Sequence, residues 1–199
     1  MGKLILVRHG ESEANRSRIF AGSGEVPLTD AGRRQAQELA ARIGAHFKPE
    51  RIVSSKFKRA LETAEIIAAG LRLPLEVVDG LEERNLGYLK GRPWAEKPEA
   101  SAEAASFLNN EEQWLWRPAG GESYEDVGRR AVAVLLALGA RYPHEDVVVA
   151  THGAVMLSVW AHLGGGYRHA QVPRNCGIIA TDYENGKLQG LQIVENDSE

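Results

Sequence analysis

Short, mostly apolar runs alternate along the chain with longer stretches in which apolar residues recur every three or four positions. The runs lie at residues 4–7, 51–54, 75–78 and 147–150, and helical spacing is found at 29–47, 60–68, 123–138 and 153–163. Such runs are typical of buried strands, and the longer spacing is typical of amphipathic helices. Because strands that alternate with helices form βαβ units, the sequence predicts an α/β protein, a three-layer αβα sandwich around a mainly parallel sheet.

Local signals refine this pattern. Ser123 begins the third helix with Asp126 three positions on, as in a capping box. Near the end of the chain, an Asn-Gly turn separates apolar segments at 176–183 and 188–194, which predicts a β-hairpin. Residues 84–122 show neither spacing and are rich in Trp, Gly and Pro. We interpret them as an irregular subregion inserted into the fold.

Composition fits a single domain that covers residues 1–199. The chain is 43% hydrophobic and 26% charged, with a formal net charge of −3, which argues against a nucleic-acid binder that works through bulk positive charge. Its single cysteine, Cys176, excludes an internal disulfide. The apolar runs are shorter than the roughly 18 residues of a membrane span. We expect a cytoplasmic protein without membrane or nucleic-acid partners, either a monomer or a homodimer.

Two predicted strands end in a histidine followed by a glycine. The run at 4–7 leads into Arg8-His9-Gly10, and the run at 147–150 leads into Thr151-His152-Gly153. In an open α/β sheet, ligands bind beyond the carboxyl ends of the strands. We therefore expect both histidines to project into one crevice.

Further charged residues follow other strands. Arg59 stands in the first turn of the helix after residues 51–54, and Glu83 and Arg84 follow the strand at 75–78. Two imidazoles, two or three guanidiniums and one carboxylate suit phosphoryl transfer through a histidine nucleophile. No metal is needed for this chemistry, because the arginines neutralise the phosphoryl charge.

With these motifs the sequence resembles the histidine phosphatase superfamily, which includes the cofactor-dependent phosphoglycerate mutases. The resemblance covers nearly the whole chain. The motifs that carry it are Leu6-Val7-Arg8-His9-Gly10-Glu11-Ser12, Asn15, Pro27-Leu28-Thr29 with Gly32, Ser54-Ser55 with Arg59-Ala60 and Thr63-Ala64, Leu81 with Glu83-Arg84 and Gly87, Gly120-Gly121-Glu122-Ser123, and Thr151-His152-Gly153.

The resemblance implies a role for each matching polar residue. His9 is expected to be the nucleophile that becomes phosphohistidine. Arg8, Arg59 and His152 are expected to bind the phosphoryl oxygens, and Glu83 to protonate the departing oxygen and later to activate water. The neighbouring Glu82 is interpreted as solvated, because the pattern Glu-Arg-x-x-Gly fixes the register.

A second set of residues is expected to bind substrate. Asn15 and the peptide around Gly22 correspond to positions that line the phosphate pocket in the family, and Gly153 is placed with them. Arg84 has two interpretations, an ion-pair partner or the ligand of a second anion. The resemblance implies neither a metal nor a cofactor.

Some positions depart from the family pattern or leave alternatives open. Ala14, Ala21 and Glu25 stand where many relatives have Trp, Gln and Asp, so the substrate is not carried over by analogy. The tryptophans of the inserted subregion either pack it onto the domain or wall an apolar pocket over the phosphate. They are Trp94, Trp114 and Trp116.

The sequence predicts a metal-independent phosphomonoester hydrolase for small phosphorylated metabolites, a histidine acid-type phosphatase. The alternative within the family is a phosphoglycerate mutase, which protects its phosphohistidine from water with a longer insertion than residues 84–151 provide. A non-catalytic module that binds phosphorylated ligands is less consistent with the sequence, because every expected catalytic residue is present.

Overall fold

A computed structural model describes residues 1–96, 111–164, 166, 170 and 172–194, and its centre is a six-stranded sheet. The strand order is β3-β2-β4-β1-β5-β6. The strands are β1 (Gly2–Arg8), β2 (Arg51–Ser54), β3 (Leu75–Val77), β4 (Val147–Thr151), β5 (Ile178–Glu184) and β6 (Lys187–Val194). β3, β2, β4 and β1 run parallel, and β5 and β6 add an antiparallel hairpin. The predicted mainly parallel sheet and its C-terminal hairpin are confirmed.

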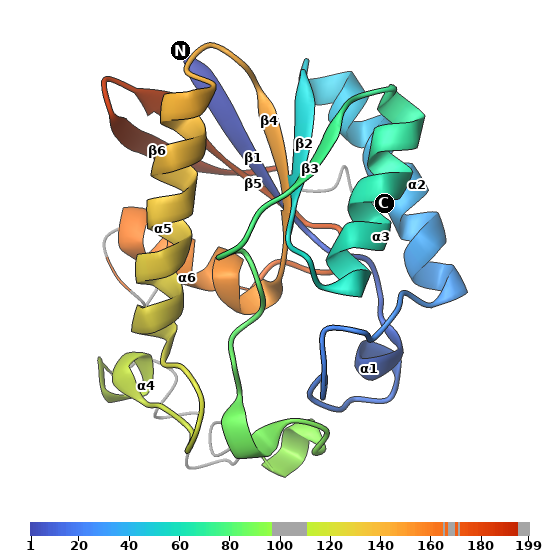
Figure 1. Cartoon of the computed structure of the whole chain (residues 1–199), viewed down its shortest axis with the longest axis vertical. Helices are drawn as coiled ribbons and strands as arrows, with labels where there is room; N and C mark the ends of the chain where they lie inside the picture. The colour runs from blue at the N-terminus through green and yellow to red at the C-terminus, as the bar shows by residue number, and fades with distance from the viewer. Residues whose placement is uncertain (97–110, 165, 167–169, 171, 195–199) are drawn as a thin grey trace.

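Four long helices cover the two faces of this sheet. They are α2 (Asp30–His46), α3 (Lys58–Leu71), α5 (Tyr124–Arg141) and α6 (Gly153–Leu163). α2 and α3 lie on one face and α5 and α6 on the other (Figure 1). Within β1, Leu4 and Leu6 pack toward α5 and α6, and Ile5 and Val7 pack toward α2 and α3. All four side chains are buried, so residues 4–7 of β1 are apolar on both faces, and the three-layer sandwich is confirmed.

The inserted subregion contains short elements that hydrophobic spacing does not reveal. Two 3₁₀ turns, η1 (Gly87–Leu89) and η2 (Trp94–Glu96), and the helix α4 (Glu111–Leu115) lie in the stretch predicted to be irregular. The short helix α1 (Glu13–Arg16) was also not predicted. None of them is longer than five residues, so no full period can develop. Residues 97–110 lie outside the described part of the chain.

The start of the C-terminal hairpin differs from the prediction. β5 begins at Ile178 rather than at Cys176. Cys176 has a positive φ of 59°, and the N–H of Gly177 donates to the carbonyl of Arg174, so a turn precedes the strand. The N–H of Cys176 donates to the carbonyl of Arg8. This turn therefore packs against the end of β1.

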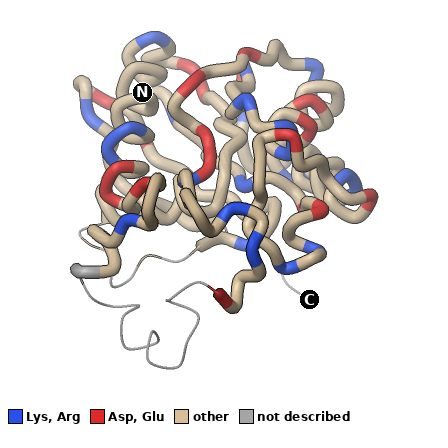
Figure 2. The backbone as a smooth tube through the Cα atoms, turned by 60° about the horizontal axis from the view of Figure 1, so that its bottom comes forward, with Lys and Arg blue, Asp and Glu red and all other residues tan. Residues whose placement is uncertain are grey.

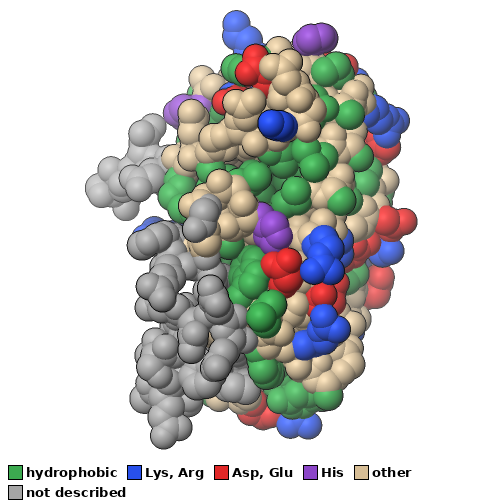
Figure 3. Space-filling model, turned by 90° about the vertical axis from the view of Figure 1, so that its left-hand side faces the viewer, with side chains coloured by type: hydrophobic (Ala, Val, Ile, Leu, Met, Phe, Trp, Pro, Cys, Tyr) green, Lys and Arg blue, Asp and Glu red, His purple; other side chains and the backbone are tan. Residues whose placement is uncertain are grey.

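Charged residues of both signs are spread along the described backbone, as Figure 2 shows. The face formed by α5 and the β5–β6 hairpin likewise mixes apolar side chains with charges of both signs (Figure 3). In the described part of the chain, no helix has the length and apolar character needed to cross a membrane.

A glycine contact joins the first turn of α2 to the loop that follows β1. A Cβ atom on Gly32 would overlap the carbonyl oxygen of Glu11, and one on Gly10 would overlap the carbonyl oxygen of Gly32. The two backbones therefore approach more closely than any side chain allows. Thr29 caps this helix end by accepting a hydrogen bond from the N–H of Gly32.

We predict that Gly32→Ala destabilises the protein by about 1–3 kcal/mol, because the new methyl group forces the two backbones apart. Gly44→Ala in the same helix is the control, since its Cβ meets only the side-chain Cδ2 of Leu71 at 3.1 Å. That change should be neutral or stabilising because Ala favours a helix over Gly. Chemical denaturation of both variants checks this, and equal stabilities would contradict it.

Candidate active site

His9 lies at the carboxyl end of β1 in a geometry that fixes its tautomer. Its side chain is buried, and Nδ1 lies 2.7 Å from the carbonyl oxygen of Gly10. Arg59 Nε donates to His9 Nε2 over 3.2 Å. A carbonyl only accepts and a guanidinium only donates, so the proton of the neutral ring is on Nδ1 and Nε2 carries a lone pair.

The surroundings of His9 also keep its ring neutral. Burial lowers the pKa of His9 well below 6.5, and the positive charges of Arg59 and Arg8 lower it further. The hydrogen bond to Gly10 opposes this shift. Near pH 7 the imidazole therefore retains its lone pair, which is the form that a nucleophile requires.

Arg8 and Arg59 form a cationic frame around this imidazole. Arg59 is buried in the first turn of α3, and Arg8 Nη1 donates to the carbonyl of Pro173 over 2.7 Å. Arg8 Nε and Arg59 Nη1 are buried and have no hydrogen-bond partner among the described residues. Because an unpaired buried N–H group is costly, these donors indicate a site for an anion.

His152 is fully buried beside His9, with the two ring centroids 5.2 Å apart. The register of the sheet explains this, because Arg8 in β1 pairs with Thr151 in β4 and the next residue of each strand is a histidine. Burial lowers the pKa of His152 well below 6.5, and the charge of Arg59 adds to the shift. The two histidines therefore meet, as expected, but only His9 is among the described residues that line the active-site cavity, and His152 is buried behind it.

Ser55 sets the orientation of the His152 ring. Its Oγ lies 2.9 Å from His152 Nε2 and accepts a hydrogen bond from the N–H of Phe57 over 3.3 Å. A hydroxyl both donates and accepts, so this contact orients the ring in either tautomer; we expect the hydroxyl to donate to His152 Nε2, which places the ring proton on Nδ1. His152 Nδ1 is buried and has no partner within the described part of the chain.

The two candidate glutamates point to different partners. Glu83 lines the same cavity as Arg8 and Arg59, and its Oε1 accepts hydrogen bonds from the N–H groups of Arg84 and Ala154, at 2.9 and 3.1 Å. Glu82 instead accepts from the N–H of Gly80 and pairs with Lys56. The interpretation of Glu82 as solvated is wrong, because this ion pair leaves its side chain only 16% exposed.

Arg84 lies under the inserted subregion. Its Nε donates to the carbonyl of Glu122 and its Nη2 to that of Trp116, at 2.8 and 3.0 Å. The guanidinium also lies 4.0 Å from the ring centre of Tyr124. These contacts use much of its donor capacity to tie residues 116–124 to the cavity wall.

The remaining predicted substrate-binding residues surround the same cavity with one exception. Asn15 and Gly153 line it, and Ala21 lines it in place of Gly22. A Cβ atom on Gly153 would lie 3.0 Å from Cγ1 of Val172 and 3.4 Å from the guanidinium carbon of Arg8, so Gly153 packs closely against both side chains. The structure thus brings Asn15 and Gly153 to the cavity and leaves Gly22 beside it.

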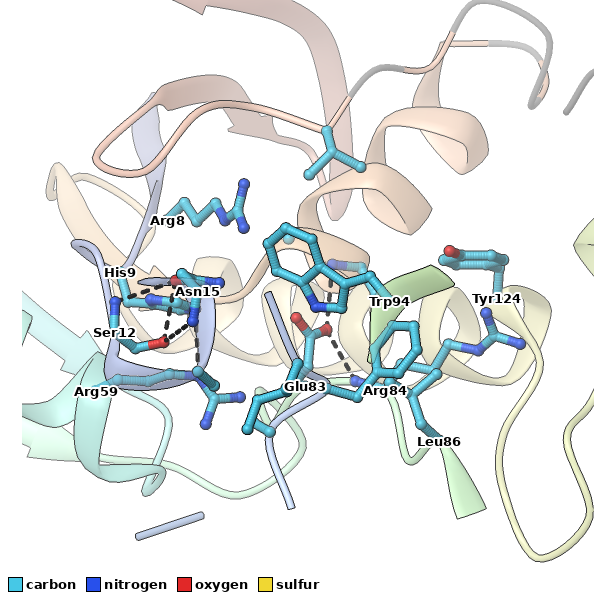
Figure 4. Close-up of a pocket in the computed structure, with 17 residues that line it drawn as sticks. Arg8, His9, Ser12, Asn15, Arg59, Glu83, Arg84, Leu86, Trp94 and Tyr124 are labelled. Atoms are coloured by element: carbon cyan, nitrogen blue, oxygen red, sulfur yellow. Dashed lines mark hydrogen bonds between the residues drawn. The ribbon is translucent and has the colours of Figure 1, made fainter. Parts of the chain in front are cut away.

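The cavity has a volume of about 400 Å³ and two distinct sides. In Figure 4, Arg8, His9 and Arg59 lie on one side, and the aromatic rings of Trp94 and Tyr124 lie on the other. In this view Glu83 lies directly below Trp94, and between His9 and Tyr124. An adjoining cavity of about 560 Å³ shares Arg59, Glu83 and Arg84 and contains Lys56 and Arg130.

One of the three tryptophans of the inserted subregion forms the pocket wall, and the other two pack the subregion onto the domain. Trp94 lines the cavity. Trp114 stacks on Tyr124 and donates to Glu125, and Trp116 lies beneath the guanidinium of Arg84. Trp94 therefore forms part of the wall, whereas Trp114 and Trp116 pack the subregion onto the domain.

Two residues of the site were not found from the sequence. Ser55 was noted only as part of a family motif, without a role of its own, and Asn175 was not considered. Asn175 Nδ2 donates to the carbonyl of His9 over 2.9 Å and to Asn15 Oδ1 over 3.3 Å. Its distance of 166 residues from His9 in the chain removes any local signal, because only the fold brings them together.

Comparisons with known proteins agree with this geometry. The model of the histidine phosphatase superfamily (branch 1) matches residues 4–196. Phosphoglycerate mutase-like protein 4 of Arabidopsis thaliana is 36% identical over 192 residues, which cover 96% of this chain and 84% of that protein. Metal-independent phosphoserine phosphatase of the same plant is 35% identical over 163 residues, 81% of this chain and 68% of that protein.

A solved structure shows the same fold. Mycobacterial glucosyl-3-phosphoglycerate phosphatase, in complex with VO3, matches with a TM-score of 0.84 and 26% identity over 98% of this chain and 99% of that one. The chain belongs to the histidine phosphatase superfamily, as its motifs indicated. The match to this family and to these phosphatases confirms the prediction of a phosphatase for small phosphorylated metabolites.

We predict that Ser55→Ala changes the tautomer of His152. In the wild type, ¹⁵N spectra should show the His152 proton on Nδ1, and in Ser55→Ala this preference should be lost because the donor to Nε2 is gone. Ser54→Ala is the control, since the buried Ser54 hydroxyl donates to the Ser55 carbonyl and not to an imidazole. An unchanged tautomer in Ser55→Ala would show that Ser55 does not orient the ring.

Proposed function

We propose that the chain hydrolyses phosphate monoesters through a phosphohistidine formed at His9 Nε2. The observation that carries this proposal is the hydrogen bond from Arg59 to His9 Nε2, which identifies a neutral ring with its lone pair inside a cationic cavity. The anion that completes the frame of Arg8 and Arg59 is the phosphoryl group of the substrate.

The first half-reaction transfers the phosphoryl group to His9. The lone pair of Nε2 attacks the phosphorus, and Arg59 exchanges its contact with the ring for a phosphoryl oxygen. Arg8 and the Nδ1–H of His152 donate to the other oxygens. The bond from phosphorus to the alcohol oxygen breaks, and Glu83 gives that oxygen a proton through Oε2.

The second half-reaction releases inorganic phosphate. Glu83, now ionised, takes a proton from a water molecule, and the water oxygen bonds to phosphorus while the N–P bond breaks. No metal takes part in either step of this proposal. Its support is the pair of guanidiniums at the nucleophile, which supply the positive charge that a metal would otherwise bring.

Further parts of the proposal concern the location, the substrate class and the phosphate pocket. The protein acts in the cytoplasm, as a monomer or homodimer, on small phosphorylated substrates rather than nucleic acid. It is a histidine acid-type phosphatase, and the lowered pKa of His9 supports this because the nucleophile stays neutral on the acid side of pH 6.5. Asn15, with Oδ1 tied to Ser12 and Asn175, completes the phosphate pocket.

The central experiment traps the intermediate. Mixing the wild-type protein with ³²P-labelled ester and quenching at high pH, where phosphohistidine survives, should label the peptide that contains His9. His9→Ala should lose both the label and turnover. His46→Ala is the control, since His46 lies on the surface at the end of α2. Full turnover by His9→Ala would contradict the mechanism.

The fate of the phosphohistidine distinguishes a hydrolase from a mutase, because water accepts the phosphoryl group in the first and a second hydroxyl accepts it in the other. The hydrolase should release phosphate from 3-phosphoglycerate faster than it equilibrates the 2- and 3-isomers, even with a trace of the bisphosphate present. Isomer exchange that outruns phosphate release would favour the mutase alternative.

We predict that Glu83→Gln slows hydrolysis of an alkyl phosphate about 10²–10⁴-fold, the usual contribution of general acid catalysis. The effect on p-nitrophenyl phosphate should be much smaller, because that leaving group departs without a proton. Glu82→Gln is the matched control, because its carboxylate pairs with Lys56. If Glu82→Gln shows the selective loss and Glu83→Gln does not, the acid is assigned to the wrong residue.

We also predict that the His9 ring stays neutral below pH 6.5. Burial and the charges of Arg59 and Arg8 lower its pKa, so the nucleophilic form persists as the pH falls and is lost only below that lowered pKa. An NMR titration of the His9 ring, with free imidazole as reference, checks this. Arg59→Gln should raise the His9 pKa, because one positive charge is removed, and an unchanged value would contradict the assigned cause.

A further inference from the structure

The side of the active-site cavity that faces the leaving group is apolar. The apolar and aromatic residues that line the cavity are Ala14, Ile19, Phe20, Ala21, Leu86, Trp94, Tyr124, Ala154 and Val172. Glu83 lines the same cavity, and in Figure 4 its carboxylate lies directly below Trp94, between the phosphate-binding side and Tyr124. Since Glu83 is the proposed donor to the departing oxygen, the alcohol attached to that oxygen extends into the apolar side.

Trp94 is held over the cavity by backbone hydrogen bonds. The segment 91–94 pairs with the loop at 18–20, through the N–H of Phe20 to Arg92, the N–H of Gly91 to Phe20 and the N–H of Trp94 to Arg18, at 2.9–3.0 Å. A bridge between Ile19 and Pro93 belongs to the same contact. The apolar wall is therefore ordered before a ligand binds.

Two large apolar side chains are left exposed at this cavity. Trp94 is 38% exposed and Val172 is 49% exposed, and both line it. Exposed apolar surface beside a concave site favours an apolar ligand, because binding removes that surface from water.

The cations of the cavity are already engaged. The basic side chains among its described lining residues are Arg8, Arg59 and Arg84. Arg8 and Arg59 surround the nucleophile, and Arg84 donates to two carbonyls and stacks on Tyr124. Within this cavity, a carboxylate on the alcohol would therefore face aromatic rings. Lys56, Lys90 and Arg130 line the adjoining cavity and are not among the described lining residues of this one.

We infer that the site takes monoesters of apolar alcohols, with an alkyl chain or aromatic ring on the phosphate, in preference to phosphorylated three-carbon acids. This rests on the proposed function and narrows its substrate class. Trp94 is the specificity-determining residue. The inferred substrates differ from phosphoserine and glucosyl-3-phosphoglycerate, which the names of two relatives specify.

A series of n-alkyl phosphates from ethyl to hexyl tests the inference, because these alcohols have nearly the same acidity and differ only in apolar length. We expect kcat/KM to rise about 2–4-fold for each added methylene, as partial to full burial of a CH₂ group predicts. Phosphoserine should be hydrolysed more slowly than hexyl phosphate. Values of kcat/KM that do not depend on chain length, or that are higher for phosphoserine than for hexyl phosphate, would overturn the inference.

Variants test whether Trp94 causes the preference for longer alkyl chains. Trp94→Ala should lower kcat/KM for hexyl phosphate at least about 10-fold and for ethyl phosphate less than about 2-fold, in line with the loss of a large apolar contact. Trp94→Phe should restore part of the preference. Tyr88→Ala is the matched control, an exposed aromatic residue of the same subregion that lies against Arg92. Equal effects of Trp94→Ala and Tyr88→Ala would also overturn the inference.

A binding measurement separates this inference from the proposed function. Calorimetry should show that hexylphosphonate, which cannot be hydrolysed, binds the wild type more tightly than ethylphosphonate. Tighter binding without hydrolysis of any ester would support the apolar subsite and contradict the hydrolase. Hydrolysis of esters together with equal binding of the two phosphonates would support the hydrolase and contradict the apolar subsite.

Discussion

The hydrogen bond between Arg59 and His9 is the contact on which the rest of the site depends. A buried imidazole beside two guanidiniums is unfavourable unless it remains neutral, and the Gly10 carbonyl decides which nitrogen then holds the proton. The same charges that suppress protonation attract an anion. One arrangement therefore produces both a nucleophile and the binding site for the group it attacks.

The sheet determines where these groups meet. Parallel pairing of β1 and β4 brings two histidines from distant parts of the chain to one edge, and α3 begins at the same edge with Arg59 in its first turn. The close backbone contact at Gly32 holds the loop after β1 against α2. Small displacements of this framework would separate donors that must reach the same phosphoryl group, so the site requires rigid packing beneath it.

Much of the fold was predictable because strands and helices of ordinary length leave a periodic pattern. The meeting of His9, Arg59 and His152 at one edge was predictable because parallel strands present their carboxyl ends at the same edge of the sheet. The short helices α1 and α4 were not predicted, since they are too short to show a helical period. Ser55 and Asn175 escaped notice because their roles depend on contacts across the fold, and Glu82 was misjudged because its partner, Lys56, lies 26 residues earlier in the chain.

The wall that carries Trp94 is built from two segments that pair through backbone hydrogen bonds. Backbone pairing constrains the path of the chain but places few demands on side-chain identity. Residues 18–20 and 91–94 can therefore change during evolution without disturbing the arginines and histidines on the other side of the cavity. Proteins that share this catalytic apparatus can diversify the alcohols they accept by exchanging side chains on one paired loop, with the phosphoryl chemistry inherited intact.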